Sequence, residues 1–292
     1  MSERSGISGT AFLKGHGTQN DFVIVPDPDG GLELSAATVA ALCDRRAGIG
    51  ADGVLRVVRS AADPVAAGMA EQAEWFMDYR NADGSIAEMC GNGVRVFARY
   101  LVHAGHVKPG ELAVATRAGV KRVRIAEDAA DGTPGEITVD MGRALLPGPD
   151  DVTVTVDDRS WPALNVNMGN PHAVAFVEDL AHAGRLYDAP ATAPAGTYPQ
   201  GVNVEFVVDR GERQVAMRVH ERGSGETRSC GTGACAVAVA AIRRAGLDPA
   251  QTGRAVSWTV DLPGGRLVIE EFPDGRIEMT GPAVIVAEGV LV

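Results

Sequence analysis

Two cysteines hold matching places in the chain, and each precedes a glycine-rich helix start. Cys90 begins the sequence C-G-N-G and Cys230 begins C-G-T-G, and each leads into a largely apolar segment that predicts a helix. A thiol at a helix N-terminus lies at the positive end of the helix dipole, which stabilises the thiolate and lowers the thiol pKa. The adjoining glycines expose backbone N–H groups that suit a carboxylate. Each cysteine therefore predicts a base beside an anion site.

Two such elements that face each other across a cleft can invert a stereocentre. One thiolate removes the proton from a carbon that bears a carboxylate, and the opposite thiol delivers a proton to the other face. Backbone N–H groups at the two helix starts are expected to stabilise the charge that develops on the carboxylate, and a closed, dry site strengthens these contacts. They are the groups near Gly91, Asn92, Gly231 and Thr232. The pair thus predicts a racemase or an epimerase.

Neither a cofactor nor a metal is expected. Pyridoxal-dependent racemases hold their cofactor through a lysine. The lysines of this chain, Lys14, Lys108 and Lys121, stand in no convincing cofactor motif. The cysteines form no C-x-x-C motif, and the histidines show no zinc-finger spacing beside them.

Charge and composition narrow the possible partners. The 292 residues include 27 Lys and Arg against 38 Asp and Glu, and the net charge of -11 disfavours nucleic acid and anionic membranes. The longest apolar run, Ala234 to Ile242, is far shorter than the ~20 residues of a membrane span. The N-terminus lacks the apolar core of a signal peptide. We expect a small-molecule substrate, a cytoplasmic location and, in that reducing environment, free thiols.

The second half of the chain repeats the order of motifs in the first. Cys230 follows Cys90 by 140 residues (230 − 90 = 140), close to half the chain. Upstream, "HGTQNDFVIV" and "MGNPHAVAFV" each run from a Gly/Asn turn into an apolar strand. Asn81 and Glu221 each stand nine residues before a cysteine (90 − 81 = 9; 230 − 221 = 9). This repetition indicates an internal duplication.

The duplication predicts two domains with the active site in the cleft between them. The N-terminal domain spans residues 1–144 and the C-terminal domain spans residues 145–278, with one cysteine in each. Their boundary is placed in the Pro/Gly-rich segment "LLPGPDD", residues 145–151. The last strand, residues 279–292, is expected to return to the N-terminal domain.

Short β-rich runs separated by turn signals make up most of the chain. The expected strands are 21–25, 54–58, 75–79, 112–116, 137–141, 152–156, 174–177, 202–208 and 215–219, with hairpin connections at "LPGGR" and "FPDGR". Expected helices run from a Ser35 cap to Leu42, from Cys90 to about Gly105 and from Cys230 to about Gly246. The helix after Cys230 has no polar stripe, so it should be buried on all sides. The predicted fold class is α/β (α+β), with two pseudo-symmetric domains, each a curved, mostly antiparallel or mixed sheet around a central helix.

At these residues the chain resembles the diaminopimelate epimerase family. The resemblance spans nearly the whole sequence and rests on "KGHGTQNDF", "GIGADG", "NADGSIAEMCGNGVR", "NMGNPH", "GVNVEF" and "ERGSGETRSCGTGACA" in the order of the family. It implies two similar domains, each with a helix inside a curved sheet. It also implies pyridoxal-independent interconversion of LL- and meso-diaminopimelate, for lysine and cell-wall precursor synthesis, by a homodimer.

The resemblance assigns roles by motif. Cys90 and Cys230 resemble the catalytic acid/base pair, and His172 and Glu221 resemble residues that tune the cysteines. The positions that match substrate binding are Asn20, Asn81, Gly91, Asn92, Asn170, Asn203, Glu221, Arg222, Gly231 and Thr232. Amides both donate and accept, and Arg222 can grip a distal carboxylate through two hydrogen bonds. One position departs from the pattern, because Gly53 stands where many members have Gln.

Simpler interpretations of these residues stay open. A single cysteine behind a capping loop is often a structural thiol, and Cys43 and Cys235 are expected to be packing residues. Asparagines beside glycine can merely hold turns, and His172 can be a hydrogen-bonded structural residue. Three other functions compete with the epimerase: a racemase for a proline-like amino acid, a thiol redox protein and a non-catalytic amino-acid binder. The absence of a close-spaced cysteine motif disfavours the redox protein.

Overall fold

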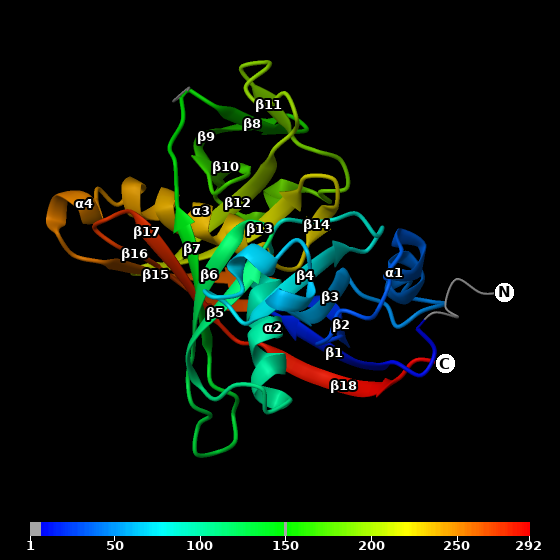
Figure 1. Cartoon of the computed structure of the whole chain (residues 1–292). Helices are drawn as coiled ribbons and strands as arrows, with labels where there is room; N and C mark the ends of the chain where they lie inside the picture. Colours follow the sequence, from blue (N-terminus) through cyan, green and yellow to red (C-terminus); the bar gives the residue numbers. More distant parts are fainter. Residues whose placement is uncertain (1–6, 149–150) are drawn as a thin grey trace. The chain divides into compact units, whose positions relative to one another are not determined.

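A computed structural model describes residues 7–148 and 151–292 of the chain (Figure 1). The chain forms two compact units. Unit 1 ends at Val139 and includes Gly281–Val292, and unit 2 is Asp140–Thr280. Residues 149 and 150 of the predicted boundary segment lie outside the described residues. The division into independent domains at 144/145, with a site between them, stays a prediction.

Unit 1 is built on one mixed sheet. Its strands are β1 (Ala11–Gly17), β2 (Asn20–Pro26), β3 (Gly53–Arg59), β4 (Trp75–Asn81), β5 (Gly110–Thr116), β6 (Gly119–Ile125), β18 (Val284–Val290) and the first part of β7 (Ile137–Arg143), which continues into unit 2. The strands from β1 to β7 pair in sequence order, and β18 pairs antiparallel with β1 at the other end. The C-terminal strand thereby joins the first strand of the chain.

Unit 2 is built on a similar sheet with an added flap. Its strands are β8 (Thr153–Val156), β9 (Arg159–Asn167), β10 (Pro171–Phe176), β11 (Ala191–Ala193), β12 (Asn203–Gly211), β13 (Gln214–Glu221), β14 (Gly225–Thr227), β15 (Val256–Leu262), β16 (Gly265–Glu271) and β17 (Arg276–Gly281). The flap consists of β11, β8 and part of β9. The hairpins at "LPGGR" and "FPDGR" join β15 to β16 and β16 to β17, as predicted.

Strand pairing confirms the duplication read from the sequence. From β1 to β7 the successive pairings are antiparallel, parallel, antiparallel, parallel, antiparallel and antiparallel. The series β9, β10, β12, β13, β15, β16 and β17 repeats this order. In the register of this repeat, Phe22 lies opposite Gly53 and His172 lies opposite Asn203. These two pairs are therefore structural equivalents.

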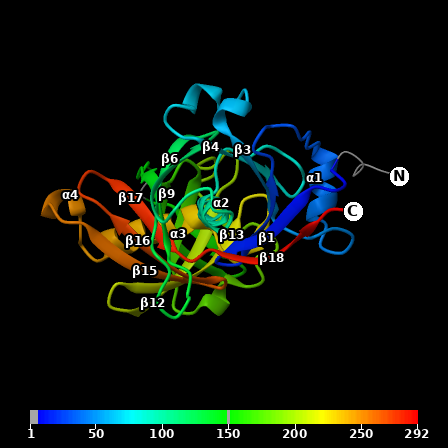
Figure 2. The ribbon, with the colours of Figure 1, turned by 60° about the horizontal axis from the view of Figure 1, so that its bottom comes forward.

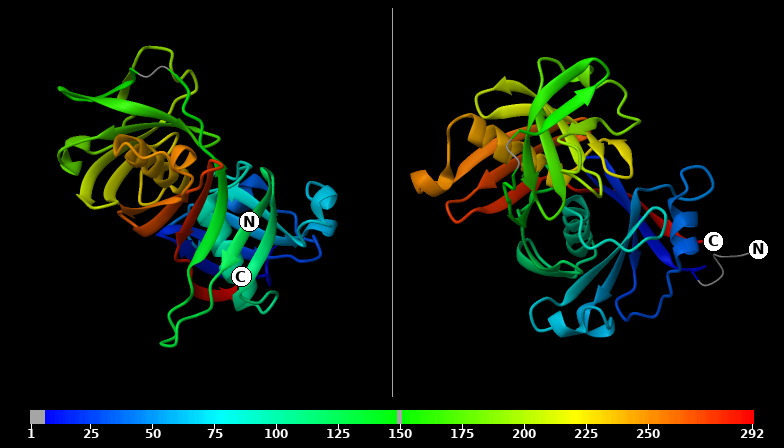
Figure 3. Two further views of the ribbon diagram at one scale, coloured as in Figure 1. Left: turned by 90° about the vertical axis from the view of Figure 1, so that its left-hand side faces the viewer. Right: turned by 90° about the horizontal axis from the view of Figure 1, so that it is seen from above.

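Each sheet wraps around one helix. In unit 1 this helix is α2 (Gly91–His103), whose residues from Gly91 to Leu101 are buried. It contacts strands from both ends of its sheet, including β18, β1 and β6, and Figure 2 shows it nearly end-on among the strands. In unit 2 it is α3 (Gly231–Arg244), which contacts β9, β10, β12, β13, β15 and β16 (Figure 3). The predicted fold class is therefore confirmed.

The predicted helix ends are confirmed to within two residues. After α2 and α3, Gly105 and Gly246 adopt left-handed backbone conformations with φ of 72° and 70°, which glycine tolerates at a helix stop. Ser35 caps α1 (Ala36–Cys43) by accepting a hydrogen bond from the Thr38 N–H at 3.0 Å. The remaining helices are short. They are α4 (Pro249–Thr252) and the 3₁₀ turns η1 (Ser60–Ala62), η2 (Ala67–Met69) and η3 (Leu180–Ala183).

Buried arginines tie α2 to the C-terminal segment of unit 1. Arg95 is fully buried and donates to the Pro282 carbonyl oxygen at 3.4 Å. Arg99 donates to the Ala283 carbonyl oxygen at 3.2 Å and also to the Gly135 carbonyl oxygen. Pro282 and Ala283 directly precede β18, so charge-assisted hydrogen bonds hold the helix to the returning strand.

The first prediction concerns Arg99. Replacement of Arg99 by Met should lower the free energy of unfolding by about 2–4 kcal/mol, because buried carbonyl oxygens lose their donor. The measurement is urea unfolding followed by circular dichroism. Arg122→Met, at an exposed position of β6, is the control and should change the stability by less than about 0.5 kcal/mol. Equal effects of the two substitutions would contradict the tie.

Candidate active site

Both cysteines begin the helices around which the sheets are built. Cys90 is the N-cap of α2 and Cys230 is the N-cap of α3, each with extended backbone angles. Each sulfur accepts a hydrogen bond from the backbone N–H three residues later, at Gly93 or Gly233, over 3.4 Å. The thiols thus take the place of the oxygen side chains that commonly cap helices. Both stand where the sequence predicts them, at helix N-termini.

The glycines after the two cysteines differ in the room around them. A Cβ atom on Gly233 would lie 2.8 Å from Glu205 Oε1 and 3.2 Å from Cys230 Sγ. A Cβ atom on Gly93 would meet Leu55 Cδ2 at 3.4 Å, an ordinary contact. A methyl group at position 233 would therefore displace a buried carboxylate or thiol, whereas position 93 has space for one.

Around Cys90, unit 1 brings together two of the predicted asparagines. Asn20 Oδ1 accepts from the Cys90 thiol at 3.6 Å and from Asn92 Nδ2 at 3.2 Å. Asn20 Nδ2 donates to Asp52 Oδ2 at 2.7 Å. Asn81 ends β4, and its amide donates to the Ser85 hydroxyl at 3.0 Å. Asn20 and Asn92 thus contact the cysteine or each other, while the amide of Asn81 holds a turn.

Charged residues beside Asn20 were not singled out from the sequence. Asp21 binds Lys14 and Arg45, and Arg45 also binds Asp52 at 2.7 Å. Burial raises the pKa of Asp21, but hydrogen bonds from Arg45 and Lys14 outweigh it and hold the pKa well below its usual value. Burial, together with the nearby charge of Asp21, raises the pKa of Asp52. The sequence signal for this cluster was the acidic residue in "GIGADG".

The remaining cysteines behave as packing residues. Burial raises the pKa of Cys43 to about 11, which keeps it a neutral thiol. Cys43 packs in an apolar cluster with Val39 and Leu42 of the same helix. Cys235 is fully buried within α3.

Around Cys230, unit 2 joins predicted site residues into one hydrogen-bonded chain. The Cys230 sulfur lies 3.5 Å from Thr232 Oγ1, which accepts from Asn170 Nδ2 at 3.4 Å. Asn170 Oδ1 lies 3.0 Å from His172 Nε2. His172 Nδ1 lies 2.6 Å from Glu205 Oε1, and both of these side chains are 0% exposed. Glu205 was missed from the sequence, where its signal was a lone acid within the apolar strand "VNVEFVV".

The predicted residues on β12 and β13 lie farther along the same sheet. Asn203 donates to the Pro171 carbonyl oxygen at 3.0 Å and accepts from the Arg222 N–H at 2.9 Å, so it ties neighbouring strands. The Arg222 guanidinium donates to the Gln200 carbonyl oxygen at 3.4 Å. Glu221 accepts from the Thr227 hydroxyl at 2.9 Å.

The prediction of a lowered thiol pKa is wrong for Cys230. Burial raises the pKa of this thiol well above its usual value, and the carboxylates of Glu221 and Glu205 raise it further. The Thr232 hydroxyl and the Gly233 N–H lower it only in part. Desolvation of the thiolate thus outweighs the helix N-terminus, because only 5% of the Cys230 surface is exposed. The surroundings of Cys230 therefore favour its thiol form over its thiolate.

Gly53 cannot carry a larger side chain with this backbone. A Cβ atom there would lie 2.5 Å from the Arg80 carbonyl oxygen and 2.7 Å from Tyr79 Cε2. The departure from the resembled pattern is therefore built into the packing of β3 against β4.

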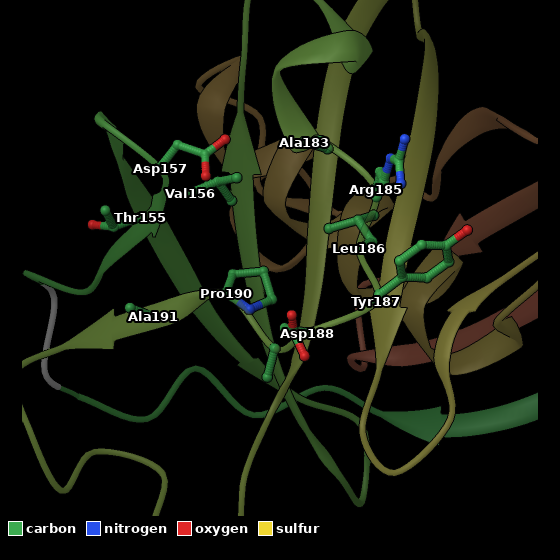
Figure 4. Close-up of a pocket in the computed structure, with 12 residues that line it drawn as sticks. Thr155, Val156, Asp157, Ala183, Arg185, Leu186, Tyr187, Asp188, Pro190 and Ala191 are labelled. Atoms are coloured by element: carbon green, nitrogen blue, oxygen red, sulfur yellow. The ribbon is translucent and has the colours of Figure 1, made fainter.

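A surface hollow of about 580 Å³ lies elsewhere in unit 2 (Figure 4). Residues 155–157 and 183–191 line it, and Arg185, Tyr187 and Asp188 are among them. The predicted site residues are not among its lining residues.

Among residues 7–148 and 151–292, no group of three or more His, Cys, Asp or Glu side chains is arranged to hold a metal ion. In the described part of the chain, no helix is long and apolar enough to cross a membrane.

The second prediction compares the two helix starts. Gly233→Ala should lower the free energy of unfolding by about 1–3 kcal/mol, because the new methyl group displaces the Glu205 carboxylate or the Cys230 thiol. Gly93→Ala, at the equivalent position of α2, should leave the stability unchanged or raise it by up to about 1 kcal/mol. Thermal unfolding of the two variants measures the difference. A destabilisation that is equal in both would refute the asymmetry in space.

Comparison with known proteins extends over both units. The family model described as diaminopimelate epimerase matches residues 12–146 and 164–286. A diaminopimelate epimerase of Streptomyces coelicolor is 75% identical over 279 residues, covering 96% of this chain and 94% of the relative. One of Thermobifida fusca is 50% identical over 282 residues, covering 95% of this chain and 96% of the relative.

Solved structures show the same fold at low sequence identity. A phenazine biosynthesis protein of the PhzF family from Bacillus anthracis superposes with a TM-score of 0.70 at 16% identity, over 97% of this chain and 99% of that one. A hydroxyproline epimerase from Agrobacterium vitis superposes with a TM-score of 0.65 at 16% identity, over 97% of this chain and 92% of that one. At 16% identity these structures support a conclusion about the fold alone. The family model and the curated relatives, which match the chain along nearly its whole length, show that it belongs to the diaminopimelate epimerase family.

Proposed function

We propose that this member of the family epimerises LL-diaminopimelate to meso-diaminopimelate without pyridoxal phosphate, with Cys90 and Cys230 as the acid/base pair. The reaction is the one that the family name states, and the two matched thiols independently predict an isomerase. The observation that carries the cysteine assignment is their equivalence, since each is the N-cap of the helix enclosed by its own sheet. A duplicated structural thiol has no need of this position, whereas a two-base epimerase requires one thiol for each face of the substrate.

The reaction is a balanced exchange of protons. One cysteine, as thiolate, takes the α-proton, and the electron pair of the broken C–H bond moves into the α-carboxylate. The other cysteine, as thiol, gives its proton to the opposite face of the α-carbon. The N–H groups at the starts of α2 and α3 stabilise the charge on the carboxylate during this step.

The surrounding polar residues fit a substrate with two amino-acid centres. We assign His172 and Glu221 to tuning of the cysteines, and Glu221 acts electrostatically on Cys230. The proposed substrate contacts are Asn20, Asn81, Gly91, Asn92, Asn170, Asn203, Glu221, Arg222, Gly231 and Thr232. Carboxylate oxygens accept from amides and from Arg222, and ammonium groups donate to Glu221. The two domains, 1–144 and 145–278, would close on this substrate.

We also propose that the protein is a homodimer and that it acts in the cytoplasm. Among the strands that the structure describes, β18 pairs with β1 on one side alone. Val286 and Val290 of this edge strand are 55% and 61% exposed. An apolar edge strand readily pairs with another chain, and we infer that a second copy covers it. The product supplies lysine and peptidoglycan precursor synthesis.

The third prediction tests the two-cysteine mechanism directly. Incubation with LL-diaminopimelate in deuterated water, without pyridoxal phosphate, should yield the meso isomer with deuterium at the α-carbon, measured by NMR. Cys90→Ala and Cys230→Ala should each lose epimerisation by at least about 100-fold, because a positioned acid or base contributes that much or more. Cys43→Ala, which removes a packing thiol, is the matched control and should retain the wild-type rate.

Four results would contradict the proposal. Exchange on proline but not on diaminopimelate would show a racemase for smaller amino acids. Full biological function of Cys90→Ala would show a binding protein. Activity that survives complete oxidation to a verified Cys90–Cys230 disulfide would refute the acid/base assignment. Retention of the α-proton by the wild type would exclude the reaction class or the substrate.

A further inference from the structure

The buried pair of Glu205 and His172 has no counterpart in unit 1. In the repeated register, His172 takes the place of Phe22, and Glu205 takes the place of Leu55. Both members of the pair are 0% exposed and lie 2.6 Å apart. A buried ion pair is costly to desolvate, and apolar residues in its place are often equally or more stable. Since unit 1 forms the same sheet with Phe22 and Leu55, the fold itself does not require the pair.

Two acceptor oxygens face the ring nitrogens of His172. Its Nδ1 faces Glu205 Oε1 at 2.6 Å, and its Nε2 faces Asn170 Oδ1 at 3.0 Å. A carboxylate oxygen and an amide oxygen both accept, so with this orientation of the Asn170 amide both ring nitrogens donate. In this orientation His172 is an imidazolium held by the Glu205 carboxylate, and the pair is neutral as a whole.

The imidazolium sets the direction of the hydrogen bonds that lead to Cys230. Because His172 Nε2 donates to Asn170 Oδ1, the amide turns its Nδ2 toward Thr232 Oγ1, 3.4 Å away. Thr232 Oγ1 accepts this hydrogen bond, and its own proton can then donate to Cys230 Sγ, 3.5 Å away, when Cys230 is a thiolate. In this series of hydrogen bonds each donor faces an acceptor. His172 donates to Glu205 and to Asn170, and Asn170 donates to Thr232. The thiolate of Cys230 thus receives donors from Thr232 and from the Gly233 N–H.

Unit 1 orients the equivalent asparagine in the opposite sense. Asn20 Nδ2 donates to Asp52 Oδ2 at 2.7 Å, which leaves Asn20 Oδ1 facing the Cys90 sulfur at 3.6 Å. An amide oxygen accepts from a thiol and repels a thiolate. The side-chain partner of Cys90 therefore favours its thiol, whereas the side-chain partner of Cys230 favours its thiolate.

We propose that Glu205 is a positioning residue for the epimerisation: by holding His172 as an imidazolium, it orients Asn170 and Thr232 as donors toward Cys230. The inference rests on the proposed role of Cys230 as a reacting thiol. Glu205 touches neither the substrate nor the sulfur in this role, and it acts through three intervening side chains. It assists deprotonation of Cys230 when this cysteine serves as the base.

The charged groups near Cys230 suggest another explanation, in which Glu205 acts on the thiol only through its negative charge. Glu221, at the end of β13, and Glu205, on β12, both oppose the thiolate by their charge, and His172, on β10, balances Glu205. If Glu205 acted only as a nearby negative charge, its removal would make Cys230 easier to ionise. If it orients the donors, its removal makes Cys230 harder to ionise. The two explanations predict opposite signs.

The test is the pH at which the Cys230 thiol is half ionised, measured in the Cys90→Ala protein. Thiolate absorbance and the rate of alkylation by iodoacetamide, with the modified cysteine identified by mass spectrometry, give two independent readings. Glu205→Gln removes the charge that stabilises the imidazolium, and the oxygen of the introduced amide accepts from His172 Nδ1. His172 Nε2 then becomes an acceptor, and the Asn170 amide turns over. The Thr232 proton is then drawn to Asn170 Oδ1 and away from the sulfur. We expect the midpoint to rise by about one pH unit, and alkylation at a fixed pH to slow about tenfold.

Two further variants separate orientation from structure. Glu205→Leu combined with His172→Phe installs the apolar pair of unit 1, so the protein should fold and show the same upward shift. In a Thr232→Val background, Glu205→Gln should cause no additional shift, because the last donor is already absent. A downward shift, an unchanged midpoint, or an equal shift with and without Thr232 would overturn the inference. None of these measurements uses substrate, so a failure of the epimerase assay would count against the proposed function alone.

Discussion

The first backbone N–H groups of two buried helices, which have no partner within the helix, are the constraint on which the proposed site depends. Each of α2 and α3 is enclosed by a sheet, so its N-terminus needs a partner from the protein or from a ligand. A cysteine sulfur supplies one partner in each unit, at 3.4 Å from the third N–H. In the proposed mechanism, backbone N–H groups of the same helix start bind the substrate carboxylate, so that one element serves both the acid/base thiol and the anion.

The two units repeat one arrangement of strands, but the side chains near their helix starts differ. The strand pairings repeat from one unit to the other, whereas the residues packed below the helix starts do not. Leu55 stands near Gly93, and the Glu205 carboxylate stands near Gly233. A side chain at position 233 would therefore displace the Glu205 carboxylate, whereas position 93 has space for a methyl group. The surroundings of the two cysteines therefore differ in the packed side chains and not in the backbone.

The sequence predicted the elements that local patterns encode, and it missed what depends on distant partners. Glycine stops, the Ser35 cap and the C-terminal hairpins were predicted because each follows from adjacent residues. The strand β6, with Lys121, Arg122 and Arg124, lacks a clear apolar run and was not predicted. The pKa of Cys230 was predicted in the wrong direction, because burial and the carboxylates of β12 and β13 come from residues far away in the chain. Glu205 was missed for the same reason, since its partner His172 lies on another strand.

Unequal thiols have a definite consequence for a reversible epimerase. An enzyme cannot alter the equilibrium between two epimers, so a difference in thiol ionisation changes only which protonation form is ready for which epimer. In the proposed relay, donors from Thr232 and Gly233 offset part of the cost that burial and the carboxylates of Glu221 and Glu205 impose on the Cys230 thiolate. The epimer that places its α-proton toward Cys230 requires this thiolate, and the opposite epimer requires the thiolate of Cys90. The relay that begins at Glu205 therefore acts on the free-energy difference between these two protonation forms of the enzyme.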